Sequence, residues 1–115
     1  MRIAVAAVML LGLIVQQGSS LAAQSGTFRA YGATGKSCGV WTMALDDQRV
    51  VYEWWVLGFI SGADYSRSGP MMGETDAPGV NAWITQYCAD HPLDTMVKAA
   101  IELVRELRAR GAKSN

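Results

Sequence analysis

The sequence contains few of the residues from which catalytic and metal sites are usually built. Its 115 residues include one histidine, two cysteines and three prolines. Cys38 and Cys88 lie too far apart for a zinc or redox motif, and a nucleophilic pair with His91 would require Cys88 to stay a thiol. His91 is better explained as a helix-start residue before Pro92. We therefore predict that the protein is not an enzyme and has no catalytic residue, metal site or cofactor.

The sequence also lacks an excess of positive or of negative charge. Ten Lys and Arg residues balance ten Asp and Glu residues. A nucleic-acid-binding face needs an excess of cations to neutralise phosphates, and a polybasic membrane patch needs the same excess. The scattered carboxylates, such as Asp46 and Asp47, are typical of a solvated surface rather than of a glycosidase acid pair. We expect no nucleic-acid partner, and other proteins are the expected partners.

The first 23 residues have the pattern of a cleavable secretion signal. Arg2 precedes an uncharged apolar run over 3–15, and the small residues around Ala22 and Ala23 offer a peptidase site. A basic start, an apolar centre of about 7–15 residues and such a site define a signal peptide, whereas a spanning helix needs roughly 20 apolar residues. We expect residues 1–23 to be removed from a periplasmic or secreted protein, which then has no membrane span.

The two cysteines are expected to form one disulfide. In an exported protein an even number of cysteines indicates a disulfide framework, and two cysteines allow only the pairing Cys38–Cys88. The alternatives, a reactive thiol pair or half of a metal site, lack the short Cys-x-x-Cys spacing. Closing a loop of about 50 residues stabilises a domain by roughly 4 kcal/mol in the chain-entropy account.

Hydrophobic periodicity predicts four helices and no strand. Glycine, serine and threonine are frequent in residues 24–36, which we expect to form a flexible lead-in. The predicted helices cover about 38–45 with Ser37 as cap, 48–63, 78–89, and a fourth that has Pro92 in its first turn. The fold class is therefore all-α. We expect a small four-helix orthogonal bundle over 37–110, with its disulfide linking helix 1 to helix 3, and a tail at 111–115.

Two of the helices are clearly amphipathic. The third places apolar residues at i, i+3, i+4, i+7 and i+8, namely Val80, Trp83, Ile84, Tyr87 and Cys88. The fourth gathers an apolar face from Leu93, Met96, Val97, Ala100, Ile101, Val104 and Leu107. These two faces are expected to supply much of the core.

The central part of the second helix, residues 54–60, is apolar nearly all round, which indicates a helix buried on most sides. Gly58 and Gly62 lie on one of its faces, and we expect them to allow a tight crossing with another helix of the chain. Trp54 and Trp55 point about 100° apart on a helix, so one of them is expected to line a surface groove or an interface.

A candidate partner-binding surface therefore joins Trp54, Trp55 and Phe59 to the two methionines of the following Gly/Pro loop, Met71 and Met72. Methionine is a soft and adaptable contact residue at many binding surfaces. The competing interpretation is that one of the two methionines fills the core and the other lies on the surface.

Residues 30–37, Ala-Tyr-Gly-Ala-Thr-Gly-Lys-Ser, fit the relaxed phosphate-loop pattern [AG]-x4-G-K-[ST]. A functional loop follows a buried strand and opens a helix, so that backbone amides bind the phosphates. Residues 24–29 do not form such a strand, and we predict no nucleotide site.

The residues Ser37-Cys38-x-x-Trp41, the stretch 55–62, and Trp83-Ile84-x-x-Tyr87-Cys88-x-x-His91-Pro92-Leu93 resemble the HdeA/HdeB-like group of small periplasmic helical proteins. The Leu-Gly-x-x-x-Gly and His-Pro pieces also resemble Rap/Tai-type immunity proteins. The resemblance covers about 37–107. It implies a signal peptide, about four helices and one disulfide from the first helix to a later one.

The resemblance implies two alternative functions. HdeA-like proteins are acid-stress chaperones whose dimer dissociates at low pH and offers apolar surface to clients, whereas Tai-type proteins bind and block one secreted effector. We therefore expect a periplasmic, non-enzymatic protein-binding domain that acts as an acid-stress chaperone. The alternatives are an immunity protein and, less favoured, a small hydrolytic enzyme. The expected partners are clients or one effector, and a homodimer is a further candidate.

Overall fold

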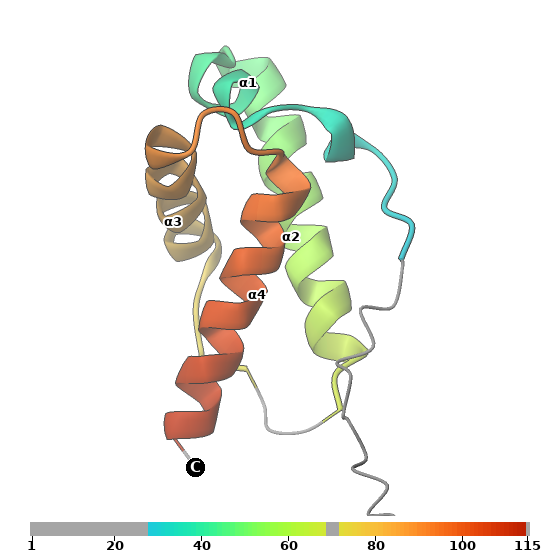
Figure 1. The fold of residues 1–115 in the computed structure, drawn as a ribbon, viewed down its shortest axis with the longest axis vertical. Helices are drawn as coiled ribbons and strands as arrows, with labels where there is room; N and C mark the ends of the chain where they lie inside the picture. Colours follow the sequence, from blue (N-terminus) through green and yellow to red (C-terminus); the bar gives the residue numbers. More distant parts are fainter. Residues whose placement is uncertain (1–27, 69–71, 115) are drawn as a thin grey trace, which may run out of the picture.

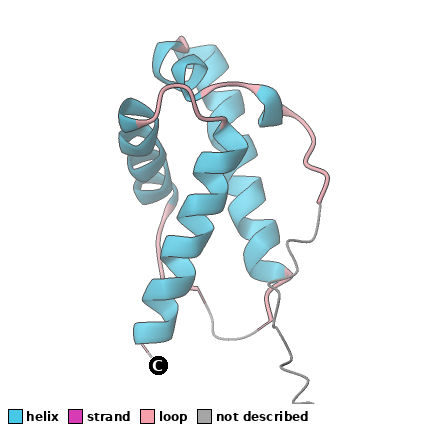
Figure 2. Ribbon diagram, in the orientation of Figure 1, coloured by secondary structure: helices cyan, strands magenta, loops and turns pink. Residues whose placement is uncertain are grey.

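The computed structural model describes residues 28–68 and 72–114, which are mainly helical (Figure 1; Figure 2). The elements are η1 (Ala33–Gly35, a 3₁₀ turn), α1 (Cys38–Met43), α2 (Asp46–Tyr65), α3 (Ala77–Asp90) and α4 (Met96–Lys113). Within the described ranges, strand-like pairing is limited to one isolated antiparallel bridge between Ser37 and Thr95. The predicted all-α class is confirmed. The predicted signal, 1–23, lies outside the described residues.

Helix α4 is the element around which the others are arranged. It contacts α1, α2, α3 and η1, and Figure 1 shows α2 and α3 on either side of it, with the short α1 near its start. Its buried residues recur every three or four positions: Met96, Ala99, Ala100, Leu103, Val104, Leu107 and Gly111. This stripe buries one face of α4 against the other helices, as an amphipathic helix requires. No helix in the described part of the chain is long and apolar enough to cross a membrane.

The bounds of α4 differ from the prediction at both ends. The helix begins at Met96 rather than near Pro92, because the Thr95 side chain caps it by accepting a hydrogen bond from the Lys98 amide (3.3 Å). Leu93, predicted on the apolar face, therefore precedes the helix and is 94 % exposed. At the other end the helix continues to Lys113, so most of the predicted tail is helical.

The loop before α3 approaches the last turns of α4 closely. The Gly73 amide donates a hydrogen bond to the Leu107 carbonyl (2.8 Å), and a Cβ at Gly73 would lie 2.8 Å from the Cβ of Arg110. Any larger residue at position 73 would push the loop away from α4. Because Gly111 is also buried there, this contact explains why α4 stays ordered beyond residue 110.

Helix α2 begins at Asp46, earlier than the predicted residue 48. Asp46 and Asp47 occupy its first turn, where the helix dipole favours negative charge. The helix ends at Tyr65, and its buried residues are Val56 and Ile60. It is therefore covered on one face rather than on most sides.

The residues before α1 are attached to the loop between α3 and α4. The Cys38 amide donates to the Asp94 carbonyl (2.7 Å), the Gly39 amide to that of Pro92 (3.0 Å), and the Met96 amide to that of Lys36 (2.9 Å). The described part of the predicted flexible lead-in, 28–36, is thus tied down at its end. The side chain of Ser37 makes no capping bond within the described residues, because loop carbonyls take the first amides of α1. Those amides are therefore not directed at a phosphate.

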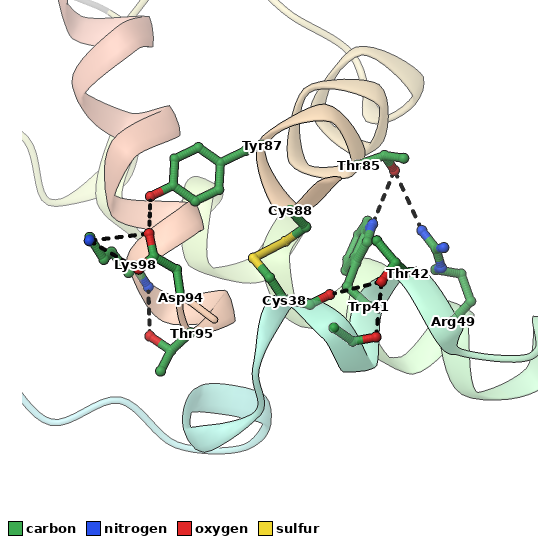
Figure 3. Close-up of a disulfide and its surroundings, with 11 residues drawn as sticks. Cys38, Trp41, Thr42, Arg49, Thr85, Tyr87, Cys88, Asp94, Thr95 and Lys98 are labelled. Carbon is green, nitrogen blue, oxygen red and sulfur yellow. Dashed lines mark hydrogen bonds and ion pairs between the residues drawn. A yellow bond between two sulfur atoms is a disulfide. The ribbon is translucent and has the colours of Figure 1, made fainter. Parts of the chain in front are cut away.

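The disulfide joins α1 to α3 as predicted. Cys38 and Cys88 are fully buried, with their Cα atoms 4.7 Å apart (Figure 3). Beside them lies the buried ring of Trp41, whose Nε1 donates to the Thr85 hydroxyl (3.0 Å). The guanidinium of Arg49 lies 4.7 Å from the centre of the Trp41 ring. The disulfide and these polar contacts fix α1 to both α3 and the start of α2.

Removing the disulfide is expected to lower the free energy of unfolding by about 2–5 kcal/mol. The variant that carries both Cys38→Ala and Cys88→Ala should unfold at a lower urea concentration than the oxidised protein, because its unfolded chain is no longer restrained. Tryptophan fluorescence during urea titration measures this difference. Reduced wild-type protein serves as the control and should match the variant. Equal unfolding midpoints for oxidised and reduced protein would contradict the prediction.

Candidate functional site: an apolar groove along α2

Helix α2 exposes the face opposite to its buried one. Val50, Val51, Trp54 and Tyr65 are among the exposed large hydrophobic residues of the described chain, and Trp54 is 70 % exposed. Val51 and Val50 precede Trp54 by three and four residues, and Tyr65 follows it by eleven. At 3.6 residues per turn, all four therefore lie along one side of the helix. A contiguous group of large apolar side chains exposed to solvent is typical of a surface that binds a partner.

The segment before η1 runs along the edge of this face. The Nε1 of Trp55 donates a hydrogen bond to the Tyr31 carbonyl. The Phe59 ring lies 6.0 Å from the Phe28 ring and 5.6 Å from the Trp55 ring. Phe28 and Tyr31 themselves remain largely exposed, at 58 % and 75 %.

Gly32 is needed for this arrangement. Its φ of 88° lies in the left-handed region, and a Cβ would be placed 2.8 Å from the Cδ1 of Trp55. Any side chain there would be strained and would also collide with the Trp55 indole. The glycine therefore lets the chain turn directly against the tryptophan.

Two adjoining hollows between this segment and α2 form what we call the α2 groove. They share Phe28, Gly58 and Phe59. The groove as a whole is lined by Phe28, Tyr31, Trp54, Trp55, Gly58, Phe59, Gly62, Ala63 and Arg108, with Arg29, Ala30 and Ser66 at its edges. Its walls are aromatic and its floor consists of small residues, which suits an apolar side chain from a partner.

The expected role of Gly58 and Gly62 is wrong. Both are exposed, and a Cβ built at either position meets no atom of the described residues within 4 Å. They do not lie at a helix crossing, because the buried side of α2 is the side of Val56 and Ile60. Instead they form the floor of the α2 groove, where the missing side chains leave the surface hollow.

The structure divides the predicted binding surface. It brings Trp54, Trp55 and Phe59 together at the groove, whereas Met72 is 7 % exposed and belongs to the core. Assigning Met72 to the surface was therefore wrong, and the competing interpretation, in which one methionine fills the core, holds for it. Met71 lies outside the described residues.

The sequence reasoning missed Phe28, Tyr31 and Arg108. The only signal was the presence of two aromatic residues in a segment otherwise rich in glycine, serine and threonine. Arg108 comes from α4, so only the folded chain places it beside Gly62 and Ser66.

The arginine residues of α4 near the groove differ in whether they form ion pairs. On the same stretch of α4, Arg105 pairs with Glu102 and Arg110 with Glu106. Arg108 has no ion-pair partner among the described residues. The groove therefore has one cation at the end where α2 terminates.

A second polar cluster lies at the junction of α3 and α4 (Figure 3). The Tyr87 hydroxyl donates to Asp94 (2.6 Å), and Lys98 approaches the same carboxylate at 3.1 Å. The hydrogen bonds from Tyr87 and Lys98 hold the pKa of Asp94 below its usual value. Burial and the bond to Asp94 raise the pKa of Tyr87 to about 12.

His91 lies next to this cluster. Its ring centre is 4.5 Å from that of Tyr87, which in turn stacks on Trp83 at 5.4 Å. His91 forms the C-cap of α3. The prediction that it starts the next helix is wrong, because Thr95 takes the capping position of α4.

In the described part of the chain, His, Cys, Asp and Glu side chains form no group of three or more that would suit a metal ion. Comparison of this chain with protein-family models, with curated proteins and with solved structures finds no match to any of them.

Proposed function

We propose that this protein is an exported, non-enzymatic protein-binding domain and that the α2 groove is its contact surface. The observation that supports the proposal most directly is the group of exposed aromatic side chains, Phe28, Tyr31 and Trp54, around a small-residue floor. Tryptophan and tyrosine are the residues most enriched at the energetic centres of protein interfaces. A folded chain loses free energy by leaving them in water, so their clustering favours a binding role.

We further propose that binding is conditional on acid, as in an HdeA-like acid-stress chaperone. At neutral pH the Lys and Arg residues are balanced by Asp and Glu. As pH falls below about 4, the carboxylates become protonated and the cations then repel one another. Repulsion loosens the packing of the helices, and apolar surface becomes accessible to unfolding client proteins.

Asp94 is the carboxylate best placed to couple protonation to packing. It bonds to Tyr87 of α3 through its side chain and to the Cys38 amide through its carbonyl. Protonation removes its charge-assisted bonds with Tyr87 and Lys98 and so weakens the junction of α1, α3 and α4. The remaining ion pairs join residues three or four apart and stabilise the fold little. The Cys38–Cys88 bond is indifferent to acid and keeps the loosened chain from opening fully.

The alternative function, inhibition of one secreted effector by an immunity-type protein, is favoured by a different observation. The Trp55–Tyr31 bond and the position of Gly32 hold the groove in a fixed form. A preorganised groove loses little entropy on binding and suits one tight partner. A partner of this kind would bind equally well at neutral and acid pH.

Replacing Trp54 by alanine is expected to weaken client protection, because Trp54 is the largest exposed apolar side chain of the groove. Suppression of the acid-induced aggregation of a model client, followed by light scattering at about pH 3, measures the effect. Leu93→Ala is the control, since the Leu93 side chain is even more exposed than that of Trp54 (94 % against 70 %) but lies in the loop between α3 and α4. Equal loss in both variants, or none in either, would argue against the groove. A wild-type protein that binds no apolar dye at any acid pH would exclude the acid-chaperone function and leave the immunity alternative.

Removing the Tyr87–Asp94 bond is expected to change the acid stability profile. Since the pKa of Asp94 is lowered by folding, its contribution is present at neutral pH and lost as pH falls below about 4. In Tyr87→Phe the pKa of Asp94 returns toward its usual value, so the variant should be less stable than wild type at neutral pH and should lose less stability as pH falls. Asp94→Asn should unfold more easily at neutral pH and depend less on pH. Urea unfolding at a series of pH values measures both variants.

Asp90→Asn is the control for this series, because Asp90 is exposed and, among the described residues, its carboxylate accepts a bond only from Gln86 of its own helix. It should keep the wild-type profile. Identical pH dependence of wild type and Asp94→Asn would show that Asp94 does not control acid opening.

A further inference from the structure

The α2 groove is long and narrow. Its two hollows measure about 330 and 390 Å³, and they adjoin along α2 from Trp54 to Ser66. Each residue of a helix advances the chain by about 1.5 Å, so the distance from position 54 to position 66 is roughly 18 Å. Pockets for small molecules usually measure about 300–1,000 Å³. The groove therefore has room for a small molecule, and its shape favours a linear one.

The middle of the groove, where the two hollows meet, is apolar. The rings of Phe28 and Phe59 and the backbone of Gly58 line both hollows. The nearest polar side-chain group, the Nε1 of Trp55, already donates to the Tyr31 carbonyl. A polar group placed here would leave water without gaining a hydrogen bond. A ligand that runs through the groove must therefore be apolar along most of its length.

The charged residues that line the groove are all positive. Arg29 lines the hollow beside Trp54, and Arg108 lines the hollow beside Ser66, whereas no Asp or Glu of the described residues lines either hollow. Neither arginine has an ion-pair partner in the described part of the chain. Because Lys and Arg equal Asp and Glu over the whole sequence, this positive charge is local to the groove. It favours a ligand with an anionic end.

We propose that the α2 groove binds one molecule of a free long-chain fatty acid, with the carboxylate at Arg108 and the alkyl chain over Gly62 and Gly58 toward Trp54. The planar guanidinium of arginine matches a carboxylate through two parallel hydrogen bonds. The alkyl chain gains free energy as its methylene groups leave water for the aromatic walls. This site goes beyond the proposed function, because it rests on the groove alone and needs no protein partner.

The negative groups near the end of α2 are already compensated. Carbonyls at the C-terminus of a helix carry partial negative charge and would disfavour a carboxylate. The Gly62 carbonyl accepts a hydrogen bond from the Ser66 amide (3.0 Å), and the Asp64 carbonyl accepts one from the Arg67 side chain (2.9 Å). The Asp64 carboxylate is paired with the same arginine at 3.3 Å. Arg108 is therefore available to an incoming anion.

A free fatty acid fits the groove better than the surface of an anionic bilayer does. Attraction to such a surface requires a cluster of several cations. Only two cations of the described residues line the groove, and they belong to different hollows. A single alkyl chain can also enter a recess along one helix, which a flat surface would leave unfilled.

The first test compares head groups on one alkyl chain. The oxidised protein is titrated by calorimetry at neutral pH, where a carboxylate is ionised, with dodecanoate, dodecanol and dodecyltrimethylammonium below their micelle concentrations. We expect one dodecanoate per chain and a Kd at least ~10-fold higher for the other two, because only a carboxylate forms charge-assisted bonds with Arg108. Equal affinity for all three overturns the proposal, and so does the absence of dodecanoate binding.

The second test separates the head group from the alkyl chain by substitution. Arg108→Gln should raise the Kd of dodecanoate at least ~10-fold and leave that of dodecanol unchanged. Arg105→Gln is the matched control, because it removes an exposed cation of α4 that does not line the groove. Equal weakening of dodecanoate binding in both arginine variants overturns the proposal.

Gly58→Leu should weaken the binding of both dodecanoate and dodecanol. Leucine fills the floor of the groove without meeting another described part of the chain, and it favours helix more than glycine does. Ala82→Leu, on the exposed side of α3, is the control and should bind as wild type does. Dodecanoate binding that tolerates Gly58→Leu would place the ligand outside the groove and overturn the proposal.

Cosedimentation with phosphatidylglycerol vesicles distinguishes a free fatty acid from a bilayer. We expect no more protein in the pellet than with phosphatidylcholine vesicles, whereas cosedimentation that Arg108→Gln abolishes would overturn the proposal in favour of a bilayer. These results are distinct from failure of the proposed function. A protein that binds no dodecanoate but protects clients through Trp54 keeps that function, and one that binds dodecanoate but protects no client keeps only the fatty-acid site.

Discussion

The attachment of α1 to the loop between α3 and α4 is the constraint on which the rest of this structure depends. The disulfide Cys38–Cys88 fixes α1 to α3, and the amides of Cys38 and Gly39 are bonded to the carbonyls of Asp94 and Pro92. These bonds satisfy the first amides of a helix of six residues, too short to be stable alone. They also set where α4 begins, and α4 then provides the face against which α2 and α3 pack.

The same constraint explains why α2 keeps an exposed side. With α1 held against α3, no helix of the described chain covers the outer face of α2, and the segment 28–31 lies only along its edge. The apolar residues of that face therefore remain in water. The α2 groove follows from this uncovered face.

The proposed acid response depends on the junction of α1, α3 and α4. Asp94 is bonded there to Tyr87 and Lys98, while its carbonyl supports α1. Protonation of Asp94 thus acts on the contact between three helices, whereas the other ion pairs of the described residues join side chains only three or four positions apart.

The sequence by itself determined the four helices and the disulfide. Periodic apolar residues specify which face of α3 and α4 is buried, and two cysteines allow only one pairing within the chain. The two ends of α4 were predicted less accurately than its buried face. Thr95 rather than Pro92 begins the helix, and Gly73 packs against its last turns. The position of the α2 groove, in contrast, was decided only by the tertiary structure. Since the central stretch of α2, residues 54–60, is apolar nearly all round, its pattern does not tell which face another element covers. Packing against α4 buried Val56 and Ile60 and left Gly58, Gly62 and Trp54 exposed as a groove.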